Sequence, residues 1–329
     1  EAAVEVARAA LGDAGPGVEW RSAAFGNTAH LELGSPYPTD SVELVDAADA
    51  VLMGAIAGPE ELPPELPKGE PCLLSLRRQL GVWANLRPVC SNPALFAASP
   101  LRPERLQGVD ILFVRELTGG IYYGEKTRDA NSATDVCRYT VLEIERVLRM
   151  ACDLARSRRK KITMVDKANV LETSRLWRDT ATRIAGEEYP DLDYEHVLVD
   201  AMAMHLLNRA ADFDVIVTEN MFGDILTDEA SMLAGSMGLL PSAALGDGTR
   251  GLFEPVHGTA PDIVGRGIAN PYAAISSVAM LLRWSLGLAE AADRIDAAVA
   301  AAVADRVWTP DLGGAANTRS VTDAVLERL

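Results

Sequence analysis

Short apolar runs alternate with longer segments of helical spacing along most of this chain. Runs of this kind occupy residues 110–114, 161–165 and 213–217, and each is long enough for one buried strand. Between them, residues 141–157 and 173–185 repeat apolar side chains with the period of an amphipathic helix. Strands that alternate with helices predict an α/β fold with a largely parallel, mixed sheet.

The remaining segments extend the same pattern. Further strands are expected at residues 18–24, 50–53 and 195–199, and further helices at residues 1–11, 41–48 and 289–304. Residues 73–87 are expected to form a helix that runs towards a strand. A turn at Asn220 and Gly223 is expected to separate the last apolar run from a helix that continues to Ala234. Neither a GxGxxG sequence after a strand nor a GxxxxGK[ST] sequence occurs, which argues against a Rossmann fold and against a P-loop.

Polar residues recur directly after the expected strands. They are Arg115, Lys167, Asp200 and Asn220. In open α/β sheets, ligands bind at the carboxyl ends of the strands. We therefore expect these four side chains to belong to one site.

The charge balance excludes some classes of partner. The 329-residue chain carries a formal net charge of −16, which argues against an extended nucleic-acid interface. An anionic substrate would then require a local cluster of arginines. No N-terminal signal and no apolar run of about 18 residues is present, so neither secretion nor membrane insertion is expected.

The cysteines indicate the compartment. Cys72, Cys90, Cys137 and Cys152 show no CxxC spacing and no paired histidines. This arrangement predicts free thiols in a reducing, cytoplasmic environment and argues against a structural zinc site.

Two aspartates mark the candidate metal site. Asp224 and Asp228 lie four residues apart, so one helix face would present two carboxylates about 6 Å apart. Mg²⁺ and Mn²⁺ bind oxygen donors of this kind and complete their coordination with water and substrate oxygens. The alternative is that acidic residues favour a helix N-terminus because of its dipole.

Basic and phenolic residues suggest an acid-binding site. Arg77, Arg87 and Arg115 stand in three separate segments, and guanidinium groups match carboxylates bidentately. Lys167 follows a strand, a position suited to a proton acceptor, and Tyr122 lies in a glycine-flanked loop. The alternatives are solvated arginines, an ion pair between Lys167 and a nearby aspartate, and a tyrosine that only packs.

The segment from residue 253 to 271 contains few residues suited to a core. It carries His257, Asp262 and Asn270 between glycines and prolines. An acidic side chain suits the two hydroxyls of an adenosine ribose and repels a 2′-phosphate. The alternative is an ordinary long loop.

Seven motifs resemble one enzyme family. They are LLSLR, ANLRP, VRELTGGIYYGE, VDKANVLE, VDAMAMHL, FGDILTDEASMLAGSMGLLPSA and FEPVHGTAPDIVGRGIANP. Together they resemble the β-decarboxylating dehydrogenases of isocitrate and isopropylmalate, most closely the isopropylmalate branch, from the first helix to the end of the chain. The resemblance implies that family's two-domain fold. Residues 1–82 with 236–329 would form a cofactor-side domain, and residues 83–235 a domain for dimerisation and for metal and substrate binding.

The resemblance also implies roles for individual residues. The carboxylates of the acid substrate would be bound by Arg77, Arg87 and Arg115, and its alkyl group would contact Leu73, Leu74 and Val170. Tyr122 and Lys167 would act as the acid–base pair, assisted by Asp200, and the ligands of Mg²⁺ or Mn²⁺ would be Asp200, Asp224 and Asp228. The residues implied for NAD⁺ binding are Glu70, Asn169, Glu254, His257, Gly258, Ala260, Asp262 and Asn270. In the family, the counterparts of Lys167 and Asp200 come from the other subunit, which implies a homodimer.

The expected activity is NAD-dependent and metal-dependent oxidative decarboxylation of a 3-alkylmalate, 3-isopropylmalate above all, for leucine biosynthesis. The alternatives are a relative acting on D-malate, tartrate or a specialised alkylmalate, and a non-catalytic paralogue. Two departures from the family pattern bear on this expectation. Cys72 stands where a glycine is usual, which would narrow the alkyl pocket, and the family's first strand and GDGIGPE-type loop are expected to precede residue 1 in the native protein.

Overall fold

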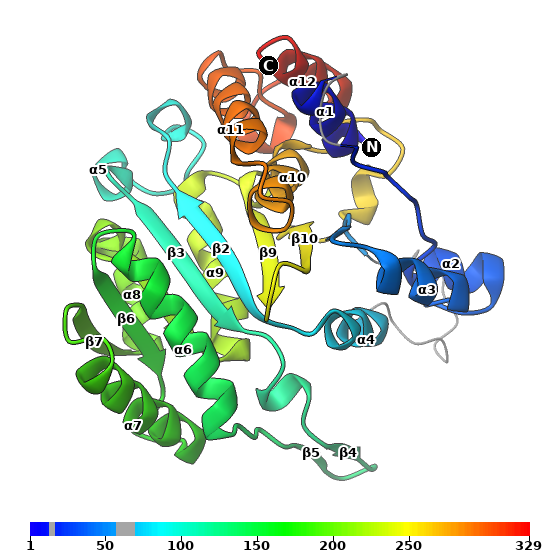
Figure 1. The fold of residues 1–329 in the computed structure, drawn as a ribbon. Helices are drawn as coiled ribbons and strands as arrows, with labels where there is room; N and C mark the ends of the chain where they lie inside the picture. Colours follow the sequence, from blue (N-terminus) through cyan, green and yellow to red (C-terminus); the bar gives the residue numbers. More distant parts are fainter. Residues whose placement is uncertain (13–16, 57–69) are drawn as a thin grey trace. The chain divides into compact units, whose positions relative to one another are not determined.

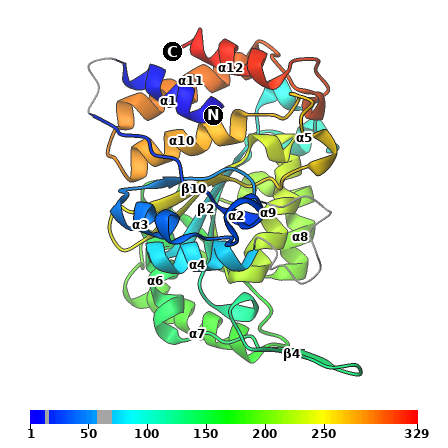
Figure 2. The ribbon, with the colours of Figure 1, turned by 90° about the vertical axis from the view of Figure 1, so that its right-hand side faces the viewer.

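The computed structural model describes residues 1–12, 17–56 and 70–329, without the side chains of Glu70 and Pro71. The chain divides into two compact units. The terminal unit combines Glu1–Val82 with Ser236–Leu329, and the central unit is Trp83–Gly235. Figures 1 and 2 show the elements of both units from two directions.

The central unit is built on five strands. In spatial order they are β2 (Val82–Cys90), β3 (Asp110–Glu116), β8 (Val215–Thr218), β6 (Lys161–Asp166) and β7 (Asp193–Leu198). The β2–β3 pair is antiparallel and the other pairs are parallel. All four residues of β8 are buried, as expected for a parallel strand covered on both faces.

Helices cover both faces of these strands (Figure 1). One layer contains α6 (Val141–Arg156) and α7 (Glu172–Glu187), and the other contains α8 (Val199–Asn208) and α9 (Asn220–Ala234). The start of α6 is fixed by a capping box, in which the side chains of Thr140 and Glu143 satisfy each other's backbone N–H groups. α9 stops at Gly235, whose φ of 102° only glycine adopts readily.

A two-stranded arm projects from the central unit (Figures 1 and 2). β4 (Lys126–Arg128) and β5 (Ala133–Asp135) are antiparallel, and all six residues are exposed. The unit's shorter elements are α5 (Pro103–Leu106), η1 (Pro93–Leu95), η2 (Gly120–Tyr122) and η3 (Ala210–Asp212). An isolated hairpin of this size is marginal in water, so the arm has little stability of its own.

The described part of the terminal unit holds three strands under a helical layer. β1 (Val51–Leu52) pairs in parallel with β10 (Gly251–Pro255), which pairs antiparallel with β9 (Pro241–Gly246). The buried helix α10 (Tyr272–Trp284) packs on these strands and against α1 (Ala2–Leu11) and α11 (Ala289–Ala304). The other elements are α2 (Gly26–Leu33), α3 (Thr39–Ala47), α4 (Glu70–Leu80), α12 (Thr318–Leu326), η4 (Met237–Leu239), η5 (Pro261–Ile263) and η6 (Pro310–Leu312).

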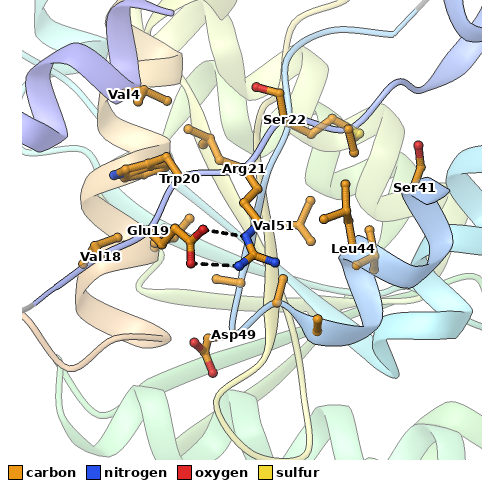
Figure 3. Close-up of a pocket in the computed structure, with 18 of the residues that line it drawn as sticks. Val4, Val18, Glu19, Trp20, Arg21, Ser22, Ser41, Leu44, Asp49 and Val51 are labelled. Carbon is orange, nitrogen blue, oxygen red and sulfur yellow. Dashed lines mark hydrogen bonds and ion pairs between the residues drawn. The ribbon is translucent and has the colours of Figure 1, made fainter.

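A cavity of about 860 Å³ lies within the terminal unit (Figure 3). Its lining combines apolar side chains such as Trp20, Leu44 and Val51 with the charged side chains of Glu19 and Arg21. Within the described part of the chain, neither residues 17–25 nor the edge of β1 away from β10 pairs with another strand. Residues 17–25 and β1 both line the cavity, and among the described residues neither has a strand partner on that side. None of the described residues predicted for the functional site lines it.

The predicted α/β class with a largely parallel sheet is confirmed, as are the helices expected at residues 1–11, 41–48, 141–157, 173–185 and 289–304. The strand expected at residues 18–24 is wrong, because an extended segment needs a neighbouring strand to form a ladder. The helix expected at residues 73–87 ends at Leu80, since Gly81 takes a φ of 68° and leads into β2.

The turn expected at Asn220 and Gly223 is also wrong. The Glu219 carboxylate accepts a hydrogen bond from the backbone N–H of Phe222 at 2.7 Å, so α9 already begins at Asn220. Gly223 lies within the first turn, where a Cβ would collide with Arg115 and Thr218. It is a glycine because of this close approach.

All four cysteines are free thiols, and Cys72 and Cys152 are buried. Among the described helices, none has the length and apolarity that crossing a bilayer requires.

Candidate active site

The first two turns of α9 carry the two predicted metal-binding carboxylates. The Glu219 cap fixes where the helix begins, and the helical repeat then places Asp224 and Asp228 one turn apart on the same face. Their side chains are 35% and 57% exposed, so both remain accessible. Burial, with the neighbouring Asp224 carboxylate, raises the pKa of Asp228, while Arg87 opposes this shift.

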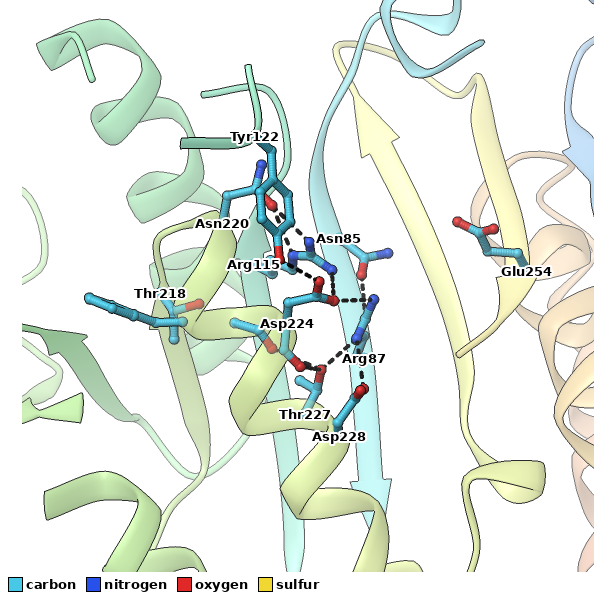
Figure 4. Close-up of polar contacts among 12 residues, drawn as sticks. Asn85, Arg87, Arg115, Tyr122, Thr218, Asn220, Asp224, Thr227, Asp228 and Glu254 are labelled. Carbon is cyan, nitrogen blue, oxygen red and sulfur yellow. Dashed lines mark hydrogen bonds and ion pairs between the residues drawn. The ribbon is translucent and has the colours of Figure 1, made fainter. Parts of the chain in front are cut away.

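Asp224 already has three partners in the central unit (Figure 4). The Arg115 Nη1 atom lies 2.5 Å from its Oδ1 atom, and the Tyr122 hydroxyl donates to its Oδ2 atom at 2.8 Å. The Arg87 Nη2 atom lies 3.5 Å from Oδ1. Because both guanidinium groups are almost fully buried, the carboxylate provides charge compensation that water does not supply there.

Arg115 extends from β3 and is oriented by Asn220. The Asn220 carbonyl oxygen accepts hydrogen bonds from Nε at 3.1 Å and Nη2 at 2.8 Å. One edge of the guanidinium is therefore taken by the protein. Its Nη1 end faces Asp224, which is where a substrate carboxylate would have to approach.

Arg87 is oriented by its own strand and by α9. Its Nε atom donates to the Asn85 side chain, two residues earlier in β2, at 2.6 Å. Its Nη1 atom donates to the Thr227 hydroxyl at 2.5 Å and lies 3.9 Å from the carboxylate of Asp228. These contacts direct the guanidinium toward the side of α9 that carries the two aspartates (Figure 4).

Tyr122 ends η2, in the loop that follows β3. Burial, and then the negative charge of Asp224, raise the pKa of its phenol to about 12. The phenol is therefore neutral at physiological pH and holds a proton 2.8 Å from a carboxylate oxygen. The neutral phenol thus still carries the proton that a general acid must deliver.

Lys167 and Asp200 form a separate pair in the central unit. The Lys167 Nζ atom lies 2.6 Å from Asp200 Oδ1, with the two side chains 27% and 62% exposed. The hydrogen bond from Lys167 lowers the pKa of Asp200. Asp166, the last residue of β6 and the neighbour of Lys167, accepts two hydrogen bonds of 2.7 and 2.8 Å from Arg178. Within the described part of this single chain, no three acidic, histidine or cysteine side chains come together as a metal site, so Asp200 does not join Asp224 and Asp228 here.

Arg77 belongs to the terminal unit, on α4. Its Nη2 atom lies 3.1 Å from the Glu254 carboxylate of β10, and its buried Nε atom has no hydrogen-bond partner among the described residues. Leu73 and Leu74 are half-buried on the same helix, and the Glu70 side chain lies outside the described residues.

The predicted cofactor residues of the terminal unit follow β10. Asp262 is exposed in η5, and His257 bonds the Gly258 carbonyl at 2.9 Å. Both ends of the Asn270 carboxamide are engaged, since it donates to Asp311 at 3.0 Å and accepts from the Tyr272 backbone N–H. A Cβ at Gly258 would meet nothing within 4 Å, so the segment borders open space. Ala260 lies in the same segment and Glu254 in β10 itself, whereas Asn169 and Val170 are exposed after β6 of the central unit.

The residues present fit the implied cofactors in chemistry. Two carboxylates on adjacent turns are hard oxygen donors, and a divalent metal bound this way needs at least one further ligand. An exposed aspartate among glycines fits an adenosine ribose without a 2′-phosphate.

Two residues of the central cluster, Asn85 and Thr227, were not predicted from the sequence. Both hold Arg87, whereas Asn220, which was expected in the site, holds Arg115. Sequence spacing could have suggested these two residues, but only relative to a charged residue already chosen. Asn85 lies two positions before Arg87 and so on the same face of a strand, and Thr227 lies three positions after Asp224 and so on the same face of a helix.

Comparison with known proteins decides the family. The model of the isocitrate/isopropylmalate dehydrogenase family matches residues 1–325 of the chain. The chain belongs to this family. It is 50% identical over 309 residues to the 3-isopropylmalate dehydrogenase of Rhodopirellula baltica, covering 92% of this chain and 86% of the relative. It is 54% identical over 289 residues to the 3-isopropylmalate dehydrogenase of Anaeromyxobacter dehalogenans, covering 86% and 82%.

A solved structure of the same family agrees with the fold. The crystal structure of isocitrate dehydrogenase from Methylococcus capsulatus superposes with a TM-score of 0.88 at 35% sequence identity. The match covers 99% of this chain and 94% of the other. The predicted resemblance to the β-decarboxylating dehydrogenases is therefore confirmed along the whole chain.

Proposed function

We propose that this dehydrogenase oxidises and decarboxylates a 3-alkylmalate, specifically 3-isopropylmalate, in leucine biosynthesis. The observation that carries the proposal is the central cluster, in which Arg87, Arg115 and Tyr122 surround the Asp224 carboxylate one turn from Asp228. It combines cations for an acid substrate, a phenol that holds its proton and two carboxylates for a divalent metal. The relatives named 3-isopropylmalate dehydrogenase support this choice of substrate.

The expected cofactors are NAD⁺ and Mg²⁺ or Mn²⁺. Asp224 and Asp228, with Asp200 from a second subunit, would hold the metal, and Asp262 would bind the adenosine ribose. When bound, the metal supplies Lewis-acid catalysis and NAD⁺ supplies the hydride acceptor.

The protein's own groups would bind the substrate and move two protons. The buried guanidinium groups of Arg87 and Arg115, together with Arg77, bind and orient the substrate carboxylates. Lys167, assisted by Asp200, accepts the proton of the C2 hydroxyl as that carbon is oxidised. After carbon dioxide has left, Tyr122 delivers a proton to C3. Each turnover thus yields a 2-oxo acid, CO₂ and NADH.

Substrate choice would rest on α4 of the terminal unit. Leu73 and Leu74 precede Arg77 by about one helical turn and present alkyl groups rather than hydrogen-bond donors. Burying an isopropyl group against such side chains contributes roughly 1.5–3 kcal/mol. Val170 would take part in the same pocket, and Cys72 would limit its size.

We further propose that the working unit is a homodimer with shared sites. Among the described residues, Lys167 and Asp200 form an accessible pair with no further metal-binding side chains gathered around them. Asp200 begins α8, which together with the adjacent α9 exposes Met204, Leu207 and Ile225. Large apolar side chains gathered around accessible reactive groups are typical of a subunit interface. The central unit would dimerise, and the terminal unit would hold most of the cofactor.

The experiment that tests the activity measures NADH formation by the purified protein with NAD⁺ and Mg²⁺. 3-Isopropylmalate, D-malate, tartrate and isocitrate are compared with and without EDTA. We expect fast turnover of 3-isopropylmalate that EDTA abolishes. Preference for one of the other acids would refute the substrate, and silence on all four with no NAD⁺ binding would favour a non-catalytic paralogue.

A further inference from the structure

Tyr139 lies between the loop that carries Tyr122 and the helix that carries Asp224. It immediately precedes the Thr140 cap of α6 and is 6% exposed. Its hydroxyl donates to Glu219 Oε2 at 3.0 Å and accepts from the backbone N–H of Asn220 at 3.0 Å. One phenol thus binds the cap of α9 and the residue that follows it.

Asn220 connects this phenol to Arg115. Its backbone N–H is bound by Tyr139, and its side-chain oxygen binds two nitrogen atoms of Arg115. Its amide nitrogen donates to the Gly119 carbonyl at 3.2 Å, which joins the loop after β3 to the start of α9. A shift of Asn220 would therefore move both Arg115 and this loop.

The Tyr139 ring fixes the loop from its other side. A Cβ at Gly119 or Gly120 would collide with the ring, so the turn packs directly on it. The loop is further held by Glu116, a fully buried carboxylate that accepts from the backbone N–H groups of Thr118 and Gly119 at 2.8 Å each. Trp177 of α7 meets the edge of the ring at a centroid distance of 5.4 Å.

We infer that Tyr139 is a positioning residue for the active site, which through Asn220 and the Gly119–Gly120 turn sets the directions of Arg115 and Tyr122 toward Asp224. The Tyr139 hydroxyl bonds to none of the groups proposed to contact substrate. It acts through Glu219 and Asn220, which hold those groups. The inference rests on the proposed function, because its effect is measured on binding of the acid substrate. Displacements of about 1 Å at such groups can lower a rate by about 10²-fold.

The test replaces the hydroxyl alone, with Tyr139→Phe in the full-length enzyme. We expect the KM for 3-isopropylmalate to rise about 10-fold and kcat/KM to fall about 10–100-fold, as for other residues that orient ligand-binding groups. The KM for NAD⁺ should not change, because the terminal unit carries most of the proposed cofactor residues. A merely structural loss would reduce the amount of active enzyme, which lowers apparent kcat and leaves both KM values unchanged.

Tyr189→Phe is the matched control. Tyr189 is in the same unit and is also 6% exposed, and its hydroxyl lies 3.5 Å from the Arg149 carbonyl, outside the network. Its kinetic constants should equal those of the wild type. Glu219→Gln, which alters the acceptor of the Tyr139 hydroxyl, should raise the KM for 3-isopropylmalate in the same direction and serves as the second variant if Tyr139→Phe does not fold.

A second readout separates this inference from the proposed function. Thermal protection by 3-isopropylmalate with Mn²⁺, without NAD⁺, reports binding of the acid alone. Wild-type protein without turnover or protection would refute the proposed substrate. Active wild type together with normal KM and protection in the Tyr139→Phe and Glu219→Gln variants would overturn the role of Tyr139.

Discussion

The central unit contains two groups of reactive residues that differ in how complete they are. Around Asp224, two buried guanidinium groups and a phenol are already in contact, and neutral side chains orient each guanidinium. Lys167 and Asp200 instead form an ion pair whose carboxylate is 62% exposed, on a surface with exposed apolar side chains. The first group is assembled by one chain, whereas the second has its reactive atoms available to another molecule.

The two groups should differ in how much they contribute to the stability of the fold. An ion pair with buried partners is costly to break, because the remaining charge has lost its water. An exposed pair contributes about 0–1 kcal/mol and can be rearranged at little cost. Removing charges from the two groups should therefore affect different properties of the enzyme.

The largest expected effect is on turnover, in Lys167→Met. Loss of the proton acceptor should reduce kcat about 10³-fold, within the range for general acid–base groups. The fold should persist, because among the described residues the lysine forms its ion pair with an exposed carboxylate. NADH formation gives the rate, and circular dichroism with gel filtration gives the folding and assembly. Turnover close to the wild-type value would remove Lys167 from the mechanism.

A mixing experiment sharpens the comparison between the two groups. Lys167→Met and Tyr122→Phe variants are each expected to be almost inactive. If Lys167 serves the partner's site, half of the sites in a mixed dimer regain both groups, so unfolding and refolding the mixture should restore roughly a quarter of wild-type activity. Refolding each variant alone is the control. A mixture as inactive as its components would place both residues in the site of one chain.

Asp224→Asn and Asp200→Asn compare the groups in stability. Asp224→Asn removes the carboxylate shared by Arg87 and Arg115 and should lower the free energy of unfolding by about 1–2 kcal/mol. This is less than the roughly 3–5 kcal/mol of a fully buried pair, because Asp224 is one-third exposed. Asp200→Asn should change it by under about 0.5 kcal/mol. Urea denaturation without metal measures both, and equal losses would contradict the distinction.

Leu74→Ser tests whether specificity lies outside both groups. A hydroxyl in place of the alkyl side chain should lower kcat/KM for 3-isopropylmalate about 10-fold relative to D-malate. Leu33→Ser, at an exposed leucine of the same unit, should leave that ratio unchanged. An equal fall for both substrates in Leu74→Ser would mean that the residue affects folding and not substrate choice.

The smallest effect concerns the titration of Tyr122. Burial and Asp224 raise the pKa of this phenol from 10.0 to about 12, so the folded state favours its neutral form. The stabilisation from this preference is complete below pH 10 and is lost as the pH rises toward 12. The phenolate absorbance of wild type minus Tyr122→Phe should therefore appear only above pH 10. A difference signal already near neutral pH would show that the phenol is not held neutral.

Local pattern was sufficient for much of the secondary structure. Residues 141–157 and 289–304 repeat apolar residues at helical spacing, and the structure has helices at Val141–Arg156 and Ala289–Ala304. The family motifs likewise rest on residue identity alone, and the family assignment is confirmed. The spacing of Asp224 and Asp228 placed two carboxylates on one helix face, because the helical repeat is independent of the rest of the fold.

Tertiary structure decided which neighbours those residues have. Residues 18–24 have the composition of a strand, yet no described strand lies beside them, and a ladder needs two members. Gly223 has the composition of a turn, but the Glu219 cap starts the helix before it, and the close approach of Arg115 explains why the residue is a glycine. Tyr139 meets Asn220, and Asn220 meets Arg115, across long sequence separations that hydrophobic periodicity does not encode. The sequence by itself determined many helices, several strands and the reactive groups, because these depend on nearby residues, and only packing determined how those groups are oriented.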